Sequence, residues 1–201
     1  MQQPTGDSRP LFPAGALGRY VNPDHPSIEI DDLGFQGNYG SGTDSTDPTI
    51  NILHDDPRFE SITAFLRNCV ADYLDNIVSY QYESFSIIHS WVNRAGDGAI
   101  QRMHYHGNSV VSGVYYLYSS RSNSPLIFEK TEVNTSPYLA IAPREQTLYN
   151  ANRMAFPAES GVCYLFPSNV KHGYDVPNQG GTRVSIAFNV MLNGIGLFYQ
   201  I

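Results

Sequence analysis

Two histidines stand one residue apart in the stretch "QRMHYH", just before the apolar run "SVVSGVYYLY". We expect residues 99–106 to form a strand, and residues two apart in a strand point to the same face, so His104 and His106 would project together. Neutral imidazole is a good ligand for iron, zinc, copper and nickel. The pair is therefore a candidate metal site, although an isolated HxH pair is more often structural than metal-binding.

A third candidate ligand is His172, in the stretch "FPSNVKHGYDV". It follows an apolar strand that ends near Phe166, which would place it at the mouth of a barrel. A facial set of ligands that leaves open positions on the metal is typical of non-haem iron oxygenases. The remaining histidines, His25, His54 and His89, are expected to be ordinary surface or hydrogen-bonded residues.

The last long strand, "TRVSIAFNV", carries a second candidate site. Strict alternation puts Arg183 and Ser185 on the face opposite Val184 and Ile186. A guanidinium can hold a carboxylate through two parallel hydrogen bonds, and a nearby hydroxyl adds a third. The same alternation also suits a strand with one face in water. His172, a short distance upstream, favours a carboxylate-binding site beside the metal site.

Composition limits the architecture that must position these residues. With 201 residues, 41% of them hydrophobic and 15% charged, the chain can bury one sizeable core. Its 14 Tyr, 10 Phe, 17 Gly and 13 Pro favour strands and turns over long helices. We therefore predict a single, mainly β domain.

Charge and the N-terminal sequence exclude some classes of partner. The net charge of −7 argues against general affinity for nucleic acid, which requires a surplus of basic residues. The start "MQQPTGDSRPLFPAGALG" lacks the basic and apolar regions of a signal peptide, and no apolar run is long enough to cross a membrane. We predict a cytoplasmic protein, with Cys69 and Cys163 as buried free thiols.

The chain divides near residue 55. Residues 1–55 are rich in Gly, Pro, Asp and Ser and show no period, which predicts an irregular N-terminal arm packed on the domain formed by residues 56–201. The stretch "DDPRFESITAFLRNCVADYLDNIVSY" predicts one helix, with Asp56 as its N-cap, Pro57 at its first position and an apolar stripe against a sheet.

Short strands follow the helix at close intervals, which predicts a sandwich or jelly-roll barrel. The expected strands are "SFSIIHSWVN", "AIQRMHYH", "SVVSGVYYLY", "SPLIFEK", "YLAIAP", "QTLYN", "MAFPA", "GVCYLFP" and "GTRVSIAFNVML". Residues 119–124 and 144–153 would be loops at the mouth of the barrel, where substrate specificity is usually set.

The ordered set HxH, "SGVYYLY", "PLIF", "FPSNVKH" and "RVSIAFN" resembles the Fe(II)- and 2-oxoglutarate-dependent oxygenases over residues 84–190. It is most similar to a subgroup of small bacterial and phage members. The resemblance implies a double-stranded β-helix, a jelly-roll or cupin-like barrel, with one flanking N-terminal helix. It also implies Fe(II) as metal and 2-oxoglutarate as cosubstrate, with His104 and His172 as iron ligands.

Further residues of the cosubstrate site are implied by the same resemblance. Arg183 would hold the far carboxylate of 2-oxoglutarate, with Ser185 as the hydroxyl partner two positions on. Tyr116, in "VYYL", corresponds to a tyrosine that lines the cosubstrate pocket in prolyl hydroxylases, although core packing would explain it equally. Asn93, in "WVN", would touch the near end of the cosubstrate.

His106 departs from the common family pattern, in which a carboxylate is the middle ligand. Three neutral imidazoles would leave the ion its full charge before the cosubstrate binds. Glu129 or Asp175 could supply a carboxylate, but neither has the expected spacing. We predict that His106 is the third ligand.

The predicted function is an Fe(II)- and 2-oxoglutarate-dependent hydroxylase of a peptide, an amino acid or another small substrate. One alternative is a three-histidine, cupin-like metal dioxygenase that does not use 2-oxoglutarate. Cupins usually carry a glutamate shortly after the histidine pair, however, and residues 107–111 contain none. The other alternative is a non-enzymatic jelly-roll structural or binding module.

Overall fold

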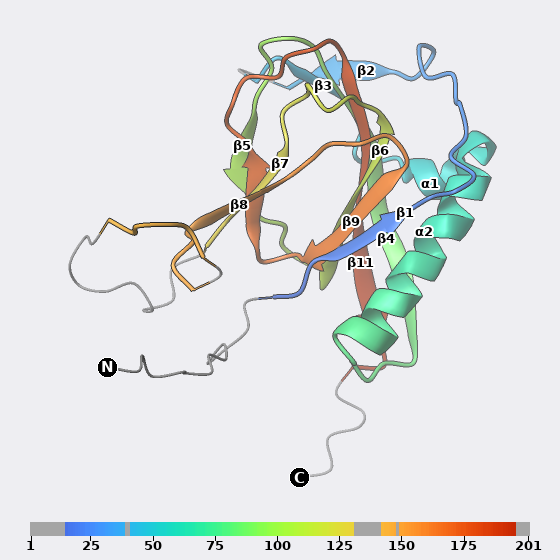
Figure 1. Cartoon of the computed structure of the whole chain (residues 1–201). Helices are drawn as coiled ribbons and strands as arrows, with labels where there is room; N and C mark the ends of the chain where they lie inside the picture. The colour runs from blue at the N-terminus through green and yellow to red at the C-terminus, as the bar shows by residue number, and fades with distance from the viewer. Residues whose placement is uncertain (1–14, 39–40, 131–141, 148, 196–201) are drawn as a thin grey trace, which may run out of the picture.

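The computed structural model describes residues 15–38, 41–130, 142–147 and 149–195. Two antiparallel sheets face each other and enclose a barrel (Figure 1). The larger sheet contains, in spatial order, β1 (Gly18–Val21), β9 (Val162–Pro167), β6 (Val111–Tyr118), β11 (Arg183–Asn193), β4 (Ser84–Ala95), β3 (Thr43–Thr46) and β2 (Phe35–Gly37). The smaller sheet contains β5 (Gln101–His104), β10 (Lys171–Tyr174), β7 (Leu126–Glu129) and β8 (Arg153–Phe156).

The helical segment begins with α1 (Ile52–Asp55) and a 3₁₀ turn (Pro57–Phe59), continues as α2 (Glu60–Asp72) and ends in a π-helical turn (Tyr73–Ile77). Asp56 and Pro57 take the predicted roles in the 3₁₀ turn, where the Asp56 carboxylate accepts a hydrogen bond from the backbone N–H of Arg58 at 3.0 Å, but the short helix α1 before this turn was not predicted. None of the described helices is long and apolar enough to span a membrane.

The main core lies between α2 and the outer face of the larger sheet (Figure 1). Ile62 and Leu66 of α2 are fully buried against strand residues such as Ile186 and Phe188. The predicted packing of the helix on a sheet is therefore confirmed. Gly113, in the "SGVYY" motif, lies opposite Phe188, and any Cβ there would overlap the Phe188 ring.

Both cysteines are buried and free, as predicted. Burial raises the pKa of Cys69 to about 12, so this thiol stays protonated at neutral pH.

The N-terminal segment contributes strands to the larger sheet. β1 pairs with β9 at one edge, while β3 pairs with β4 and carries β2 at the other edge. The division of the chain into an arm and a domain near residue 55 stays a prediction.

Among the described residues, one predicted strand is absent and one observed strand was not predicted. In the stretch "QTLYN", the described residues 146, 147, 149 and 150 form no strand, and the backbone N–H of Thr147 donates to the side-chain oxygen of Asn150 at 2.7 Å. Residues 171–174, which were not predicted as a strand, form β10. Most of "YLAIAP" lies outside the described residues.

Candidate metal centre and carboxylate pocket

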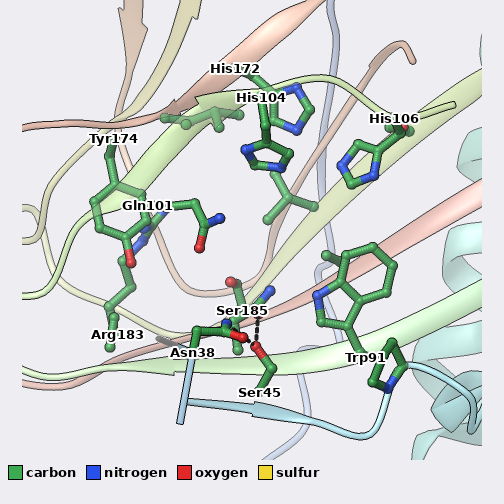
Figure 2. A pocket seen from close by; sticks show the side chains of 18 of the residues that line it. Asn38, Ser45, Trp91, Gln101, His104, His106, His172, Tyr174, Arg183 and Ser185 are labelled. Carbon is green, nitrogen blue, oxygen red and sulfur yellow. Dashed lines mark hydrogen bonds between the residues drawn. The ribbon is translucent and has the colours of Figure 1, made fainter. Parts of the chain in front are cut away.

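Three histidines from distant parts of the sequence meet at one end of the smaller sheet (Figure 2). The nitrogen atoms that His104, His106 and His172 can offer to a metal all lie within 4.8 Å of one another. Their ring centroids are 4.5 Å apart for His104 and His172, 5.0 Å for His104 and His106, and 5.1 Å for His106 and His172. The structure thus brings together the predicted set.

Strand pairing explains two of these positions. His104 is the last residue of β5 and lies directly opposite His172 on β10, so their side chains share a face. His106 is different, because β5 ends at His104 and the predicted strand does not reach it. Its backbone N–H donates instead to the carbonyl of Ser168 at 2.9 Å, and its ring lies 5.8 Å from that of Trp91.

Hydrogen bonds to carbonyls orient two of the imidazoles. Nδ1 of His104 lies 2.7 Å from the carbonyl oxygen of Arg102, and Nδ1 of His172 lies 2.8 Å from that of Val170. A carbonyl oxygen only accepts, so each Nδ1 carries the proton and each Nε2 keeps its lone pair. A metal-binding histidine typically donates its other ring N–H to a carbonyl or carboxylate in this way.

Burial keeps two of the three imidazoles neutral. Burial, followed by the neighbouring His104, lowers the pKa of His106 to about 4. Burial also lowers the pKa of His172 to about 3, although its hydrogen bond to the Val170 carbonyl opposes the shift. Both rings are therefore unprotonated at neutral pH, as a metal ligand must be.

These shifts predict how the stability of the metal-free protein depends on pH. Between pH 6.5, the ordinary imidazole value, and about pH 4, His106 and His172 take up protons in the unfolded chain but not in the folded protein. Stability is therefore full above pH 6.5 and falls as the pH drops through this window. The urea midpoint of the metal-free protein should show this, and a His106→Asn variant should show a weaker dependence. An equal dependence in both proteins would contradict the assignment for His106.

The two carboxylates considered as alternative ligands lie in ion pairs. Glu129 contacts Nζ of Lys171 at 2.6 Å and Arg153, while Asp175 contacts Arg153 at 2.7 Å. Among the described residues, the three histidines form the one group of this kind that could hold a metal.

Arg183 supplies a buried positive charge in the same cavity. Its side chain is 4% exposed, donates from Nη2 to the hydroxyl of Tyr116 at 2.8 Å and lies over the ring of Tyr174 at 4.1 Å. Its Nε has no hydrogen-bond partner. A buried guanidinium without a carboxylate is costly, and the unpaired Nε–H suits a carboxylate from a ligand.

A cavity of about 290 Å³ joins the histidines to Arg183 (Figure 2). Its described lining includes no aspartate, glutamate or lysine. Ser185 and Asn93 lie opposite each other on β11 and β4, and both line the cavity. Arg183 thus faces a pocket whose described lining offers it no carboxylate partner.

Tyr116 lies in the core and is not among the residues that line the cavity, which differs from the pocket-lining role implied by the resemblance. It is fully buried and packs against Tyr164, but its hydroxyl contacts Arg183. Burial raises the pKa of Tyr116, with the charge of Arg183 opposing the shift, so the hydroxyl stays protonated. Tyr116 therefore supports the guanidinium from behind the cavity.

The other histidines lie outside this cavity, as predicted. Nδ1 of His25 contacts the hydroxyl of Tyr115 at 2.5 Å, and His54 pairs with Asp55 on the surface. His89 is exposed on β4.

Several cavity residues were not found from the sequence. Gln101 and Tyr174 lie between the histidines and Arg183, while Ser45 and Asn38 enter from the β2–β3 hairpin (Figure 2). Trp91 could have been predicted to line the cavity, because it lies two residues from Asn93 on β4 and so points to the same face. Ser45 and Asn38 could not have been predicted in this way, because they lie in a Gly- and Ser-rich stretch without the alternating apolar pattern of a strand.

Comparison with known proteins defines the class. Residues 89–189, half of the chain, match the family described as "Putative 2OG-Fe(II) oxygenase". The chain therefore belongs to this family and is an Fe(II)- and 2-oxoglutarate-dependent oxygenase. This membership excludes the two alternatives, a dioxygenase that does not use 2-oxoglutarate and a non-enzymatic module. No curated protein matches the chain.

Three solved structures have a similar fold. An oxidoreductase of the 2OG-Fe(II) oxygenase family from Burkholderia pseudomallei is 13% identical, with a TM-score of 0.57 over 87% of this chain and 84% of that one. A Pseudomonas putida prolyl-4-hydroxylase is 14% identical, with a TM-score of 0.57 over 90% and 94%. HygX from Streptomyces hygroscopicus, solved with nickel, 2-oxoglutarate and hygromycin B, is 15% identical, with a TM-score of 0.57 over 89% and 84%. The predicted double-stranded β-helix is confirmed.

Proposed function

We propose that the chain hydroxylates a peptide or amino-acid substrate, with Fe(II) held by His104, His106 and His172 and 2-oxoglutarate anchored by Arg183 and Ser185. The observation that carries this assignment is the buried Arg183, whose Nε–H is unpaired in a cavity shared with the three clustered imidazoles. The fixed Nδ1–H tautomers of His104 and His172 support the metal roles.

Bound Fe(II) would let O₂ oxidise both reactants: 2-oxoglutarate would lose CO₂ and gain one oxygen atom to become succinate, and the other oxygen atom would convert a substrate C–H bond to C–OH. The residues of the chain place the reactants. Arg183 orients the far carboxylate through Nε and Nη, and the Ser185 hydroxyl donates a further hydrogen bond. Tyr116 holds the guanidinium in place from the core.

Trp91 and Asn93 occupy the floor of the cavity on β4. The indole of Trp91 lies against His106 and limits the movement of that ring. The neighbouring β2–β3 hairpin forms part of the rim and contributes uncharged Gln36 and Asn38. This neutral polar rim suits a substrate that offers amide or hydroxyl groups rather than a cation.

The peptide or amino-acid class rests on this neutral rim and on the structural likeness to the Pseudomonas putida prolyl-4-hydroxylase. The test is incubation of peptide and free amino-acid pools with the Fe(II)-loaded protein and 2-oxoglutarate. Mass spectrometry should find products that have gained one oxygen atom, with succinate formed in equal amount. Succinate release that responds to neither pool would contradict this substrate class.

The cytoplasmic location stays a prediction.

The role of His106 has its own test. His106→Asp should retain metal binding within about tenfold, because a carboxylate is also a competent iron ligand at this position. It should also retain 2-oxoglutarate binding. Calorimetry with Mn(II) and then 2-oxoglutarate measures both steps. Loss of both binding steps in His106→Asp would mean that the site requires a third imidazole.

A further inference from the structure

A row of polar side chains crosses the floor of the cavity in register. Gln36 on β2 lies opposite Ser45 on β3, Ser45 lies opposite Asn93 on β4, and Asn93 lies opposite Ser185 on β11. Opposed residues in a sheet share a face, and all four of these residues line the cavity. The row therefore runs from the carboxylate site to the β2–β3 hairpin.

Ser45 links the hairpin to the middle of this row. Its hydroxyl donates to Oδ1 of Asn93 at 2.8 Å and accepts from Nδ2 of Asn38 at 2.7 Å. A hydroxyl has a single proton to donate, and here Asn93 receives it. Figure 2 shows Ser45 beside Asn38 and below Ser185, with dashed lines marking its hydrogen bonds.

These bonds fix the orientation of the Asn93 carboxamide. With Oδ1 turned toward the hairpin, the amino group is the half that remains for the cavity, and it donates to no other described residue. The floor faces the histidines across the cavity, as Trp91 and Ser185 show in Figure 2. Asn93 therefore presents a hydrogen-bond donor to whatever occupies the space between the histidines and Arg183.

We propose that Ser45 is a positioning residue, which holds Asn93 so that its amino group donates to an oxygen of bound 2-oxoglutarate. The inference rests on the proposed cosubstrate site. 2-Oxoglutarate carries only acceptor oxygens at neutral pH, so a fixed donor favours it more than a freely rotating carboxamide would. Through Ser45, cosubstrate binding and the order of the β2–β3 hairpin are coupled.

The experiment measures 2-oxoglutarate binding to the Mn(II)-loaded full chain by calorimetry. Asn93→Ala removes the donor and should weaken binding about tenfold, and Ser45→Ala frees the donor and should weaken it about fivefold. Ser45→Thr keeps the hydroxyl and should stay within about twofold of the parent. The matched control is Ser41→Ala, since the hydroxyl that it removes bonds only within the hairpin, to the carbonyl of Asn38 and the backbone N–H of Thr43.

A double-mutant cycle separates positioning from general destabilisation. Once Asn93 is alanine, adding Ser45→Ala should cause no further loss of 2-oxoglutarate affinity. Hydrogen exchange supplies a readout apart from affinity: 2-oxoglutarate should protect the amides of residues 43–46 in the parent and in Ser45→Thr, and less in Ser45→Ala. If Ser45→Ala fails to fold, Asn38→Ala removes the supporting bond from an exposed position and should weaken binding in the same direction.

Additive losses in the cycle, or unchanged affinity in Ser45→Ala, would overturn the role of Ser45. Those results leave the cosubstrate site itself intact, because the parent still binds 2-oxoglutarate. Failure of the Mn(II)-loaded parent to bind 2-oxoglutarate would overturn the proposed function instead.

Discussion

Arg183→Leu is expected to weaken 2-oxoglutarate binding by about a hundredfold while leaving metal binding within a few-fold of the parent. The guanidinium is buried, and its Nε–H has no partner within the protein, so a ligand carboxylate would gain a desolvated and directional contact. Leucine fills part of the volume but offers no hydrogen-bond donor. His104 and His172 lie on the smaller sheet, and their Nδ1–H groups donate to backbone carbonyls rather than to Arg183.

Calorimetry with the Mn(II)-loaded protein measures this loss. The matched control is Arg94→Leu on the adjacent strand, because Arg94 pairs with Asp44 and does not line the cavity. Arg94→Leu should bind 2-oxoglutarate as the parent does. Similar affinity in Arg183→Leu and the parent would show that the carboxylate is anchored elsewhere.

His172→Ala should abolish stoichiometric metal binding, and His104→Ala should do the same. Each removes an imidazole whose Nδ1–H is already bonded to a backbone carbonyl, so each loses a donor that is oriented before the metal arrives. A site left with two histidines has lost one ligand of a neutral set that holds no carboxylate.

Metal analysis after anaerobic loading with Fe(II) checks this expectation. His54→Ala is the control, since His54 is exposed and lies outside the cavity. Circular dichroism should show that the variants remain folded, because His172→Ala leaves β10 with its backbone pairing. One equivalent of tightly bound Fe(II) in His104→Ala or His172→Ala would contradict the assignment.

Most of the site residues that could be predicted from the sequence follow from the alternation of side chains along a strand. On β11 it placed Arg183 and Ser185 toward the cavity and Val184 and Ile186 toward the core, because the strand is long and paired on both sides. The helix could also be predicted from the sequence, because its signals are local. They are a continuous apolar stripe and a Pro at the start of the segment.

Local patterns could not predict contacts that depend on pairing between distant segments. His106 was expected to lie in the same strand as His104, but β5 ends at His104. His106 is held near the other two histidines by a hydrogen bond from its backbone N–H to the carbonyl of Ser168. β10 is short and polar at its start, so it had no strand signal of its own, and its pairing with β5 and β7 defines it. Ser45 likewise lies beside Asn93 in the cavity only because β3 pairs with β4.

The most direct test of the central claim is an experimental structure of the protein with Mn(II) and 2-oxoglutarate bound under anaerobic conditions. We predict one metal ion bound by the imidazoles of His104, His106 and His172, with 2-oxoglutarate between that ion and Arg183. The far carboxylate should contact Nε of Arg183 and the hydroxyl of Ser185. A metal bound away from the three histidines, or a carboxylate that does not contact Arg183, would contradict the account.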